Sequence, residues 1–238
     1  MLIDLDDTIL DAYSNPEIAW LEVLTEFRSD LGGLTPEQAR DAVVASADRF
    51  WADPERGRIW RQQLFGARRE VVRLAFEAVA AEGGPVLREP ALHAIADRFS
   101  TMREERHAPF PGAIETLKEL RDHGVQLALV TNGAGEIQRA KLARFSLEAH
   151  FHHIQIEGEH GFGKPDERAY RHALQALGVG PADAWMVGDN LEWEVAAPQR
   201  IGMYAVWHDH AGRGLPEGST VRPDRTIRSL TELLQPSG

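Results

Sequence analysis

Acidic, hydroxyl and amide side chains follow several of the short apolar runs in this sequence. The first group, Asp4-Leu5-Asp6-Asp7-Thr8, comes directly after Met1-Leu2-Ile3. The other groups are Thr131-Asn132-Gly133, Gly188-Asp189-Asn190 with Glu192 and Glu194 beyond it, and Lys164 between Gly163 and Pro165. Phosphoryl transfer requires positioned acids, hydrogen-bond donors and a cation that neutralises charge. These residues are therefore our candidates for that chemistry.

The apolar runs that precede these groups have the length and composition of buried strands. Strands are predicted at residues 1–5, 125–130, 154–156, 184–187 and 204–207, with helices between them from residue 113 onwards. This alternation predicts an α/β fold, a Rossmann-like doubly wound parallel sheet with helices on both faces. Ligands of such sheets bind beyond the carboxyl ends of the strands, so the polar groups should meet at one edge.

A long stretch, residues 15–106, instead carries apolar residues at the three- and four-residue spacing of helices. Thr35 begins one of these helices, since its hydroxyl can cap the helix and Gln38 can complete a capping box. About four helices are predicted and no strand. Because the stretch interrupts the alternation directly after the first strand, we expect two domains: a core of residues 1–14 and 107–238, and a four-helix insertion of residues 15–106.

The order and context of the polar groups resemble the haloacid dehalogenase (HAD) superfamily. Asp4-Leu5-Asp6-Asp7-Thr8 resembles its first motif, DxDxT, and Thr131-Asn132-Gly133 is similar to its second. Lys164 is similar to the third motif, and Gly188-Asp189 with Glu194 to the fourth, GDxxxxD. The helical insertion has the position and size of a type C1 cap. Asn190-Leu191 resembles the phosphatases related to N-acylneuraminate-9-phosphatase and to the pyrimidine nucleotidases of this superfamily.

The resemblance implies catalytic roles. Asp4 would be the nucleophile, and Asp6 would protonate the leaving alcohol and then deprotonate water, which requires a carboxyl with a raised pKa. Lys164 would neutralise Asp4 and the phosphate oxygens. Substrate phosphate would be bound by Thr131, Asn132 and Gly133, the hydroxyl of Thr131 and the backbone amide of Asn132 donating to its oxygens.

The resemblance also implies a Mg²⁺ cofactor. Its ligands would be the carboxylates of Asp4 and Asp189 and the backbone carbonyl of Asp6, with waters completing the shell. The family usually has Asp where this sequence has Glu194. That side chain normally holds a metal-bound water and not the metal itself, so we expect the site to accommodate the extra methylene of Glu194.

The implied function is hydrolysis of a small phosphorylated metabolite through an aspartyl-phosphate intermediate. Asp6 argues against dehalogenation, because a halide leaves without a proton. A phosphomutase of the same superfamily remains an alternative, and so does a non-catalytic binding protein on the same fold.

Several of the polar residues also have simpler explanations. Acids after a strand often cap helices, so Asp7 is expected to be structural and Asn190 to be an N-cap. Histidines cluster at residues 150, 152 and 153 and at residues 208 and 210. A His-x-His pair can bind zinc, but no third ligand is evident in the sequence. In the insertion, Arg61 belongs to a basic and aromatic segment that could be a solvated face; the sharper hypothesis is that Arg61 binds substrate.

Composition limits the partners and location of the protein. The net charge of −11 over 238 residues disfavours nucleic acid, whose phosphates need a basic surface. No apolar run is long enough to cross a membrane, and the absence of cysteine excludes disulfides and thiol catalysis. We expect a cytoplasmic monomer or homodimer.

Overall fold

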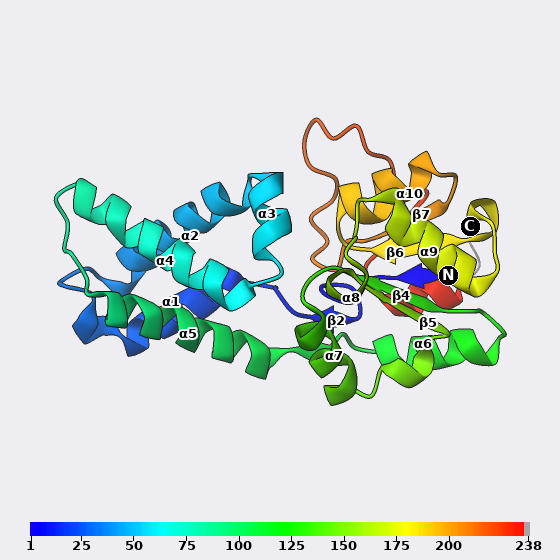
Figure 1. The fold of residues 1–238 in the computed structure, drawn as a ribbon, viewed down its shortest axis with the longest axis horizontal. Helices are drawn as coiled ribbons and strands as arrows, with labels where there is room; N and C mark the ends of the chain where they lie inside the picture. The colour runs from blue at the N-terminus through cyan, green and yellow to red at the C-terminus, as the bar shows by residue number, and fades with distance from the viewer. Residues whose placement is uncertain (236–238) are drawn as a thin grey trace. The chain divides into compact units, whose positions relative to one another are not determined.

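The computed structural model describes residues 1–235, so the last three residues of the predicted core lie outside the described residues. The chain divides into two compact units, Met1–Ala12 with Ala108–Gly238, and Tyr13–His107 (Figure 1). We call them the core unit and the helical unit and describe each by itself.

The core unit contains a six-stranded parallel sheet in the order β5-β4-β1-β6-β7-β8. Its strands are β1 (Leu2–Ile3), β4 (Ala128–Thr131), β5 (His153–Ile156), β6 (Trp185–Gly188), β7 (Tyr204–His208) and β8 (Arg225–Ile227). Strand order reverses at β1, since later strands are added on both of its sides. The predicted doubly wound α/β fold is therefore confirmed.

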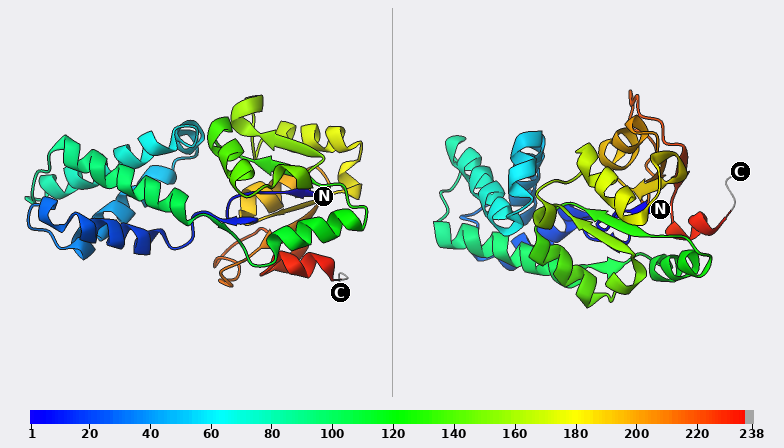
Figure 2. Two further views of the ribbon diagram at one scale, coloured as in Figure 1. Left: turned by 90° about the horizontal axis from the view of Figure 1, so that it is seen from below. Right: turned by 45° about the vertical axis from the view of Figure 1, so that its right-hand side comes forward.

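Helices cover both faces of this sheet, as Figure 2 shows. They are α6 (Ala113–Asp122), α7 (Gly135–Arg144), α8 (Glu157–His160), α9 (Glu167–Leu177) and α10 (Ala197–Arg200), with short turns η2 (Glu148–His150), η3 (Pro181–Asp183), η4 (Leu191–Ala196) and η5 (Leu230–Leu234). Successive strand residues face opposite sides. Accordingly, Ile3 belongs to an apolar cluster with Leu117 of α6, and Leu2 to one with Leu174 of α9.

Three strands of the core unit were not predicted. The edge strand β8 has three residues, and β2 (Leu10–Asp11) pairs antiparallel with β3 (Ala108–Pro109) over two residues each. Segments this short show no alternation of apolar and polar residues, so sequence periodicity cannot reveal them. The β2–β3 pair holds together the two points at which the chain leaves and re-enters the core unit.

The helical unit contains five α-helices, one more than predicted. They are α1 (Pro16–Glu26), α2 (Pro36–Trp51), α3 (Pro54–Trp60), α4 (Leu64–Ala81) and α5 (Glu89–Arg106), with a 3₁₀ turn η1 (Arg28–Asp30). The short helix α3 buries none of its residues. Thr35 and Gln38 form the predicted capping box.

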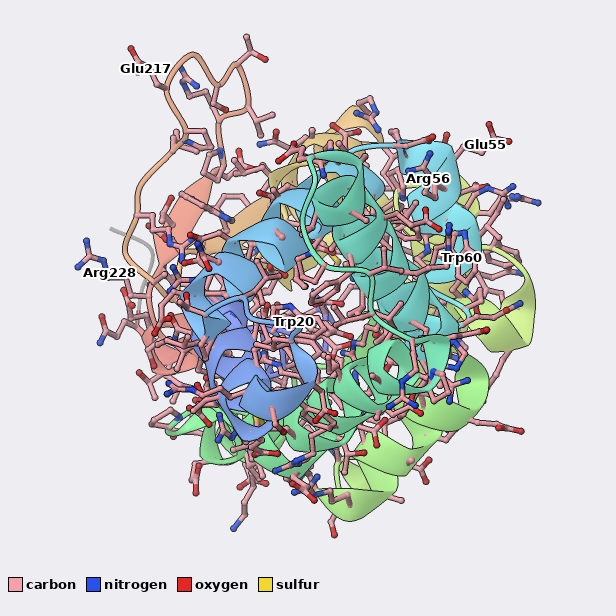
Figure 3. All side chains as sticks on the ribbon, turned by 90° about the vertical axis from the view of Figure 1, so that its left-hand side faces the viewer. Trp20, Glu55, Arg56, Trp60, Glu217 and Arg228 are labelled. Carbon is pink, nitrogen blue, oxygen red and sulfur yellow. The ribbon has the colours of Figure 1, made fainter. Side chains whose placement is uncertain are left out.

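The interior of the helical unit is apolar and aromatic. Trp20 is 4% exposed and stacks on Phe99 with ring centroids 3.5 Å apart. Figure 3 shows Trp20 among the helices, whereas Glu55 of α3 points outward. Within residues 1–235, no helix has the length and apolar character needed to span a membrane.

Candidate active site

The predicted polar residues of the core unit lie at the carboxyl ends of β1, β4 and β6, at the reversal of strand order. Asp4 follows β1, Thr131 ends β4 and Asp189 follows β6. The backbone N–H of Asp4 donates to the carbonyl of Val187 at 3.0 Å, which extends the pairing of β1 with β6 to the candidate nucleophile. This edge of the sheet is where ligands of doubly wound folds bind.

Lys164 joins two carboxylates in the interior of the site. Its ammonium group donates to Asp4 Oδ1 in a short hydrogen bond and lies 2.7 Å from Glu194 Oε1. Burial alone would lower the pKa of Lys164, but the Asp4 and Glu194 carboxylates outweigh it and raise that pKa. Burial raises the pKa of Asp4, and Lys164 partly opposes the change. The three groups form a buried network in which the lysine is the central cation.

Asn132 fixes the turn that carries Lys164. Its side-chain oxygen accepts from the Lys164 backbone N–H at 2.8 Å, and its amide nitrogen donates to the Lys164 carbonyl at 2.7 Å. A Cβ atom at Gly163 would lie 2.4 Å from the Asn132 oxygen, so this turn requires glycine. The side chain of Asn132 thus positions the lysine, and the contact of its backbone amide with phosphate stays a prediction.

Gly133 makes a contact that the sequence did not indicate. Its backbone N–H donates to Glu157 Oε2 at 3.0 Å, and its φ of 110° is one that favours glycine. Glu157 thereby anchors the loop after β4.

Asp6 is held by two side chains that were not singled out from the sequence. Lys141 Nζ lies 2.7 and 2.8 Å from the two carboxylate oxygens of Asp6, and Gln138 Nε2 donates to Asp6 Oδ2 at 3.0 Å. Gln138 also donates to Thr131 Oγ1 at 2.6 Å. Both residues belong to α7, and because the sequence of this helix is mostly polar, they would be assigned to its solvent-exposed face from sequence alone.

Composition does contain a signal for Lys141. Only three of the 26 lysine and arginine residues are lysines, namely Lys118, Lys141 and Lys164. Lys118 is exposed, whereas Lys141 and Lys164 are 6% and 1% exposed and contact the two candidate catalytic acids. A compact ammonium group fits such buried sites, whereas a guanidinium group is larger and planar.

Glu194 lies in the π-helical turn η4 after β6 and is 1% exposed. Its Oε2 accepts from the Asn190 backbone N–H at 2.7 Å, while the Asn190 side chain caps the turn by accepting from Glu192 and Trp193, as predicted. Burial raises the pKa of Glu194 to about 7. Burial, followed by repulsion from Glu194 and Asp4, raises the pKa of Asp189 to about 9. Burial is thus the main cause of the raised pKa at both acids.

Replacing Gly188 by Ala should displace Glu194. A Cβ atom there would lie 2.0 Å from Glu194 Cγ, and the Gly188 backbone is not left-handed, so the effect is purely steric. We expect a loss of about 1–3 kcal/mol of stability and at least a tenfold lower kcat, roughly 1.4 kcal/mol in the barrier. Gly180→Ala is the matched control, because its nearest contact would be 3.6 Å. Wild-type kcat and melting temperature in Gly188→Ala would contradict this role of Glu194.

The donor set fits a divalent cation. Asp4, Asp6, Asp189 and Glu194 supply four carboxylates against two ammonium groups, Lys141 and Lys164, which leaves two negative charges when all are ionised. Among residues 1–235, no three His, Cys, Asp or Glu side chains are already arranged around a common metal position. In this arrangement the two lysines contact the carboxylates of Asp4, Asp6 and Glu194.

Two further residues named from the sequence are Arg61 and Asp7. Arg61 lies in the helical unit, directly after α3. Asp7 accepts from the Ala12 backbone N–H at 3.0 Å and adopts a positive φ of 57°, which fits its expected structural role in the loop after β1.

Comparisons with known proteins agree with this architecture. The family model of haloacid dehalogenase-like hydrolases matches residues 1–202. The phosphoserine phosphatase of Thermus thermophilus is 40% identical, over 98% of this chain and 96% of the relative. Pyrimidine 5'-nucleotidase YjjG of Escherichia coli is 27% identical, over 99% of this chain and 96% of the relative.

A solved structure shares the fold over nearly its whole length. The putative HAD-hydrolase YfnB from Bacillus subtilis matches with a TM-score of 0.68 and 25% identity, over 98% of this chain and 95% of that one. The resemblance drawn from the motifs is confirmed: this chain belongs to the haloacid dehalogenase-like hydrolase family and is a phosphoric monoester hydrolase.

Proposed function

We propose that this phosphatase hydrolyses a small phosphorylated metabolite through a phosphorylated Asp4, with Mg²⁺ as cofactor. The observation that carries the proposal is the buried Asp4–Lys164–Glu194 network at the reversal of strand order, with Asp6 two residues from Asp4. A carboxylate in such a place can act as nucleophile while the lysine neutralises charge on the phosphoryl group.

The reaction has two steps. In the first, an Asp4 oxygen bonds to phosphorus, the bond from phosphorus to the alcohol oxygen breaks, and Asp6 gives that oxygen a proton. In the second, Asp6 takes a proton from water, the water oxygen bonds to phosphorus, and the Asp4–phosphorus bond breaks. Asp4 then returns to its carboxylate form and inorganic phosphate is released.

Mg²⁺ would be held by the carboxylates of Asp4 and Asp189 and the backbone carbonyl of Asp6, with Glu194 holding a metal-bound water. When bound, the cation would neutralise charge that develops on the phosphoryl oxygens. Support comes from the two uncompensated negative charges, from the raised pKa of Asp189 and from the magnesium reported for YfnB.

Removal of divalent metal should abolish turnover. After treatment with a chelator, p-nitrophenyl phosphate hydrolysis should fall to background and return on addition of Mg²⁺, which should also raise the melting temperature. Asp189→Asn should increase the half-saturating Mg²⁺ concentration by at least about tenfold. The control is Glu192→Gln, which removes a surface ion pair to Arg200. Undiminished turnover by rigorously metal-free enzyme would refute the cofactor assignment.

We further propose that the helical unit acts as a cap that controls substrate access and selection, with Arg61 among the selecting residues. Support comes from connectivity, since the unit is inserted between two segments paired as β2 and β3, a few residues beyond Asp4. Closure of such units excludes water and reopening releases product.

The substrate class can be found with a small panel. O-phosphoserine heads it, because the full-length relative of 40% identity is a phosphoserine phosphatase, and a pyrimidine 5'-monophosphate follows from the nucleotidase relative. Sugar and glycolytic phosphates complete the panel. Measurement of kcat/KM for each compound with Mg²⁺ tests the proposal, which fails if none of them is hydrolysed faster than p-nitrophenyl phosphate.

A further inference from the structure

One face of α7 presents Gln138 and Lys141, one helical turn apart, to Asp6. Lys141 contacts both carboxylate oxygens, and Gln138 adds a third hydrogen bond to one of them. All three contacts are donated to Asp6. We call these two residues the Asp6 clamp.

The Asp6 clamp is buried, which sets it apart from the other charged residues of α7. Gln138 and Lys141 are 2% and 6% exposed. Arg139, on the same helix, is 40% exposed in its side chain and pairs with Glu148 and Glu159. Lysine is rarely buried, because removing an ammonium group from water is costly unless a partner compensates it. Lys141 is therefore placed for Asp6, not for solubility.

The hydrogen bonds also fix the direction of the Gln138 amide and the Thr131 hydroxyl. A carboxylate can only accept, so the atom of Gln138 that faces Asp6 must be the amide nitrogen. That same nitrogen donates to Thr131 Oγ1. The hydroxyl hydrogen of Thr131 must then point elsewhere, and its contact to the Asn132 carbonyl is long, at 3.5 Å. Thr131 can therefore donate to a phosphate oxygen.

We propose that Gln138 and Lys141 are positioning residues that hold Asp6 as the proton acceptor of the second step, hydrolysis of phosphorylated Asp4. This inference rests on the proposed function. All three contacts are made by donors, so the Asp6 carboxylate is held in its proton-accepting form and in one orientation. In the second step Asp6 takes a proton from the attacking water, while the water oxygen bonds to phosphorus and the Asp4–phosphorus bond breaks. Gln138 donates to both Asp6 and Thr131, so one side chain positions the general base and the hydroxyl proposed to bind phosphate.

The two steps can be separated with p-nitrophenyl phosphate, whose leaving group departs without a proton. For this substrate kcat/KM reports steps up to formation of phosphorylated Asp4, whereas a slow second step limits kcat alone. Lys141→Met should lower kcat at least about tenfold and change kcat/KM less than about threefold, so that KM falls with kcat. A burst of p-nitrophenolate and accumulation of phosphorylated protein, seen by mass spectrometry after acid quench, should accompany the change.

Three further variants make the result specific. Gln138→Leu should show the same split in weaker form, and Lys141→Arg should restore part of kcat because it keeps a cation. Arg139→Met, which removes surface ion pairs of the same helix, should behave as wild type. If Lys141→Met does not fold, by circular dichroism and melting temperature, Gln138→Leu and Lys141→Arg decide the question.

The outcomes distinguish the clamp from the proposed function. If kcat/KM falls in parallel with kcat and no phosphorylated protein accumulates, the two residues are merely structural and the clamp is refuted. If wild-type enzyme turns over but Asp6→Asn never yields phosphorylated protein, the proposed two-step function itself is wrong, and the clamp falls with it.

Discussion

Asp4→Asn is expected to lower kcat by at least about a hundredfold, a barrier increase of roughly 2.7 kcal/mol, while the protein stays folded. The amide has the same shape as the carboxylate but cannot attack phosphorus. Stability should change little, because Lys164 keeps its contact with Glu194 and because burial already disfavours the charge of Asp4. Turnover of p-nitrophenyl phosphate and the melting temperature measure the two quantities.

Asp7→Asn is the matched control for this prediction. Asp7 lies in the same loop, and asparagine tolerates its positive φ of 57°. Its carboxylate accepts a backbone hydrogen bond that the amide oxygen can also accept. We expect activity close to wild type. If Asp4→Asn keeps more than about a hundredth of wild-type kcat, Asp4 is not the nucleophile.

The convergence of Asp4, Thr131 and Asp189 could be predicted because topology dictates it. Each residue follows a short apolar run, and parallel strands bring their carboxyl ends to one edge of the sheet. The prediction needed only the strands β1, β4 and β6, and the central strand β1 was recognised although it contains two residues. The acidic residues that begin at Asp4 indicated where β1 ends.

The Asp6 clamp could not be predicted by the same reasoning. Gln138 and Lys141 lie within a helix of polar composition, where sequence spacing gives the face of a residue but not what that face meets. Their burial comes from packing of α7 beside the sheet, which is a tertiary property. The rarity of lysine in the chain was the available signal, and only the structure shows that it coincides with burial.

The ion pairs of the site could also be predicted only in part from the sequence. Lys164 was expected to neutralise Asp4, but its second contact, to Glu194, depends on the π-helical turn η4 and on the absence of a side chain at Gly188. Glu194 has one methylene more than the Asp that is usual in the family, and this extra length lets its carboxylate contact Lys164. Glu194 is therefore both part of the structural network and a candidate for holding a metal-bound water.

Lys164→Met should combine loss of activity with a large loss of stability. The substitution keeps the aliphatic length and removes the ammonium group, leaving the carboxylates of Asp4 and Glu194 buried without their common cation. Breaking a buried ion pair costs about 3–5 kcal/mol, which corresponds to roughly 6–20 °C in melting temperature for a chain of this size. Lys118→Met, at an exposed lysine, should leave both quantities unchanged.

A second substitution separates the two effects of Lys164→Met. If the instability comes from uncompensated carboxylates, adding Glu194→Gln should recover part of the melting temperature, because it removes one of the two buried charges. The two changes would then be non-additive by about 0.5–3 kcal/mol, as expected for residues in direct contact. Activity should not recover, since the cation that faces the phosphoryl group is still missing. A melting temperature within about 2 °C of wild type for Lys164→Met alone would show that the buried network does not stabilise the fold, even if catalysis is lost.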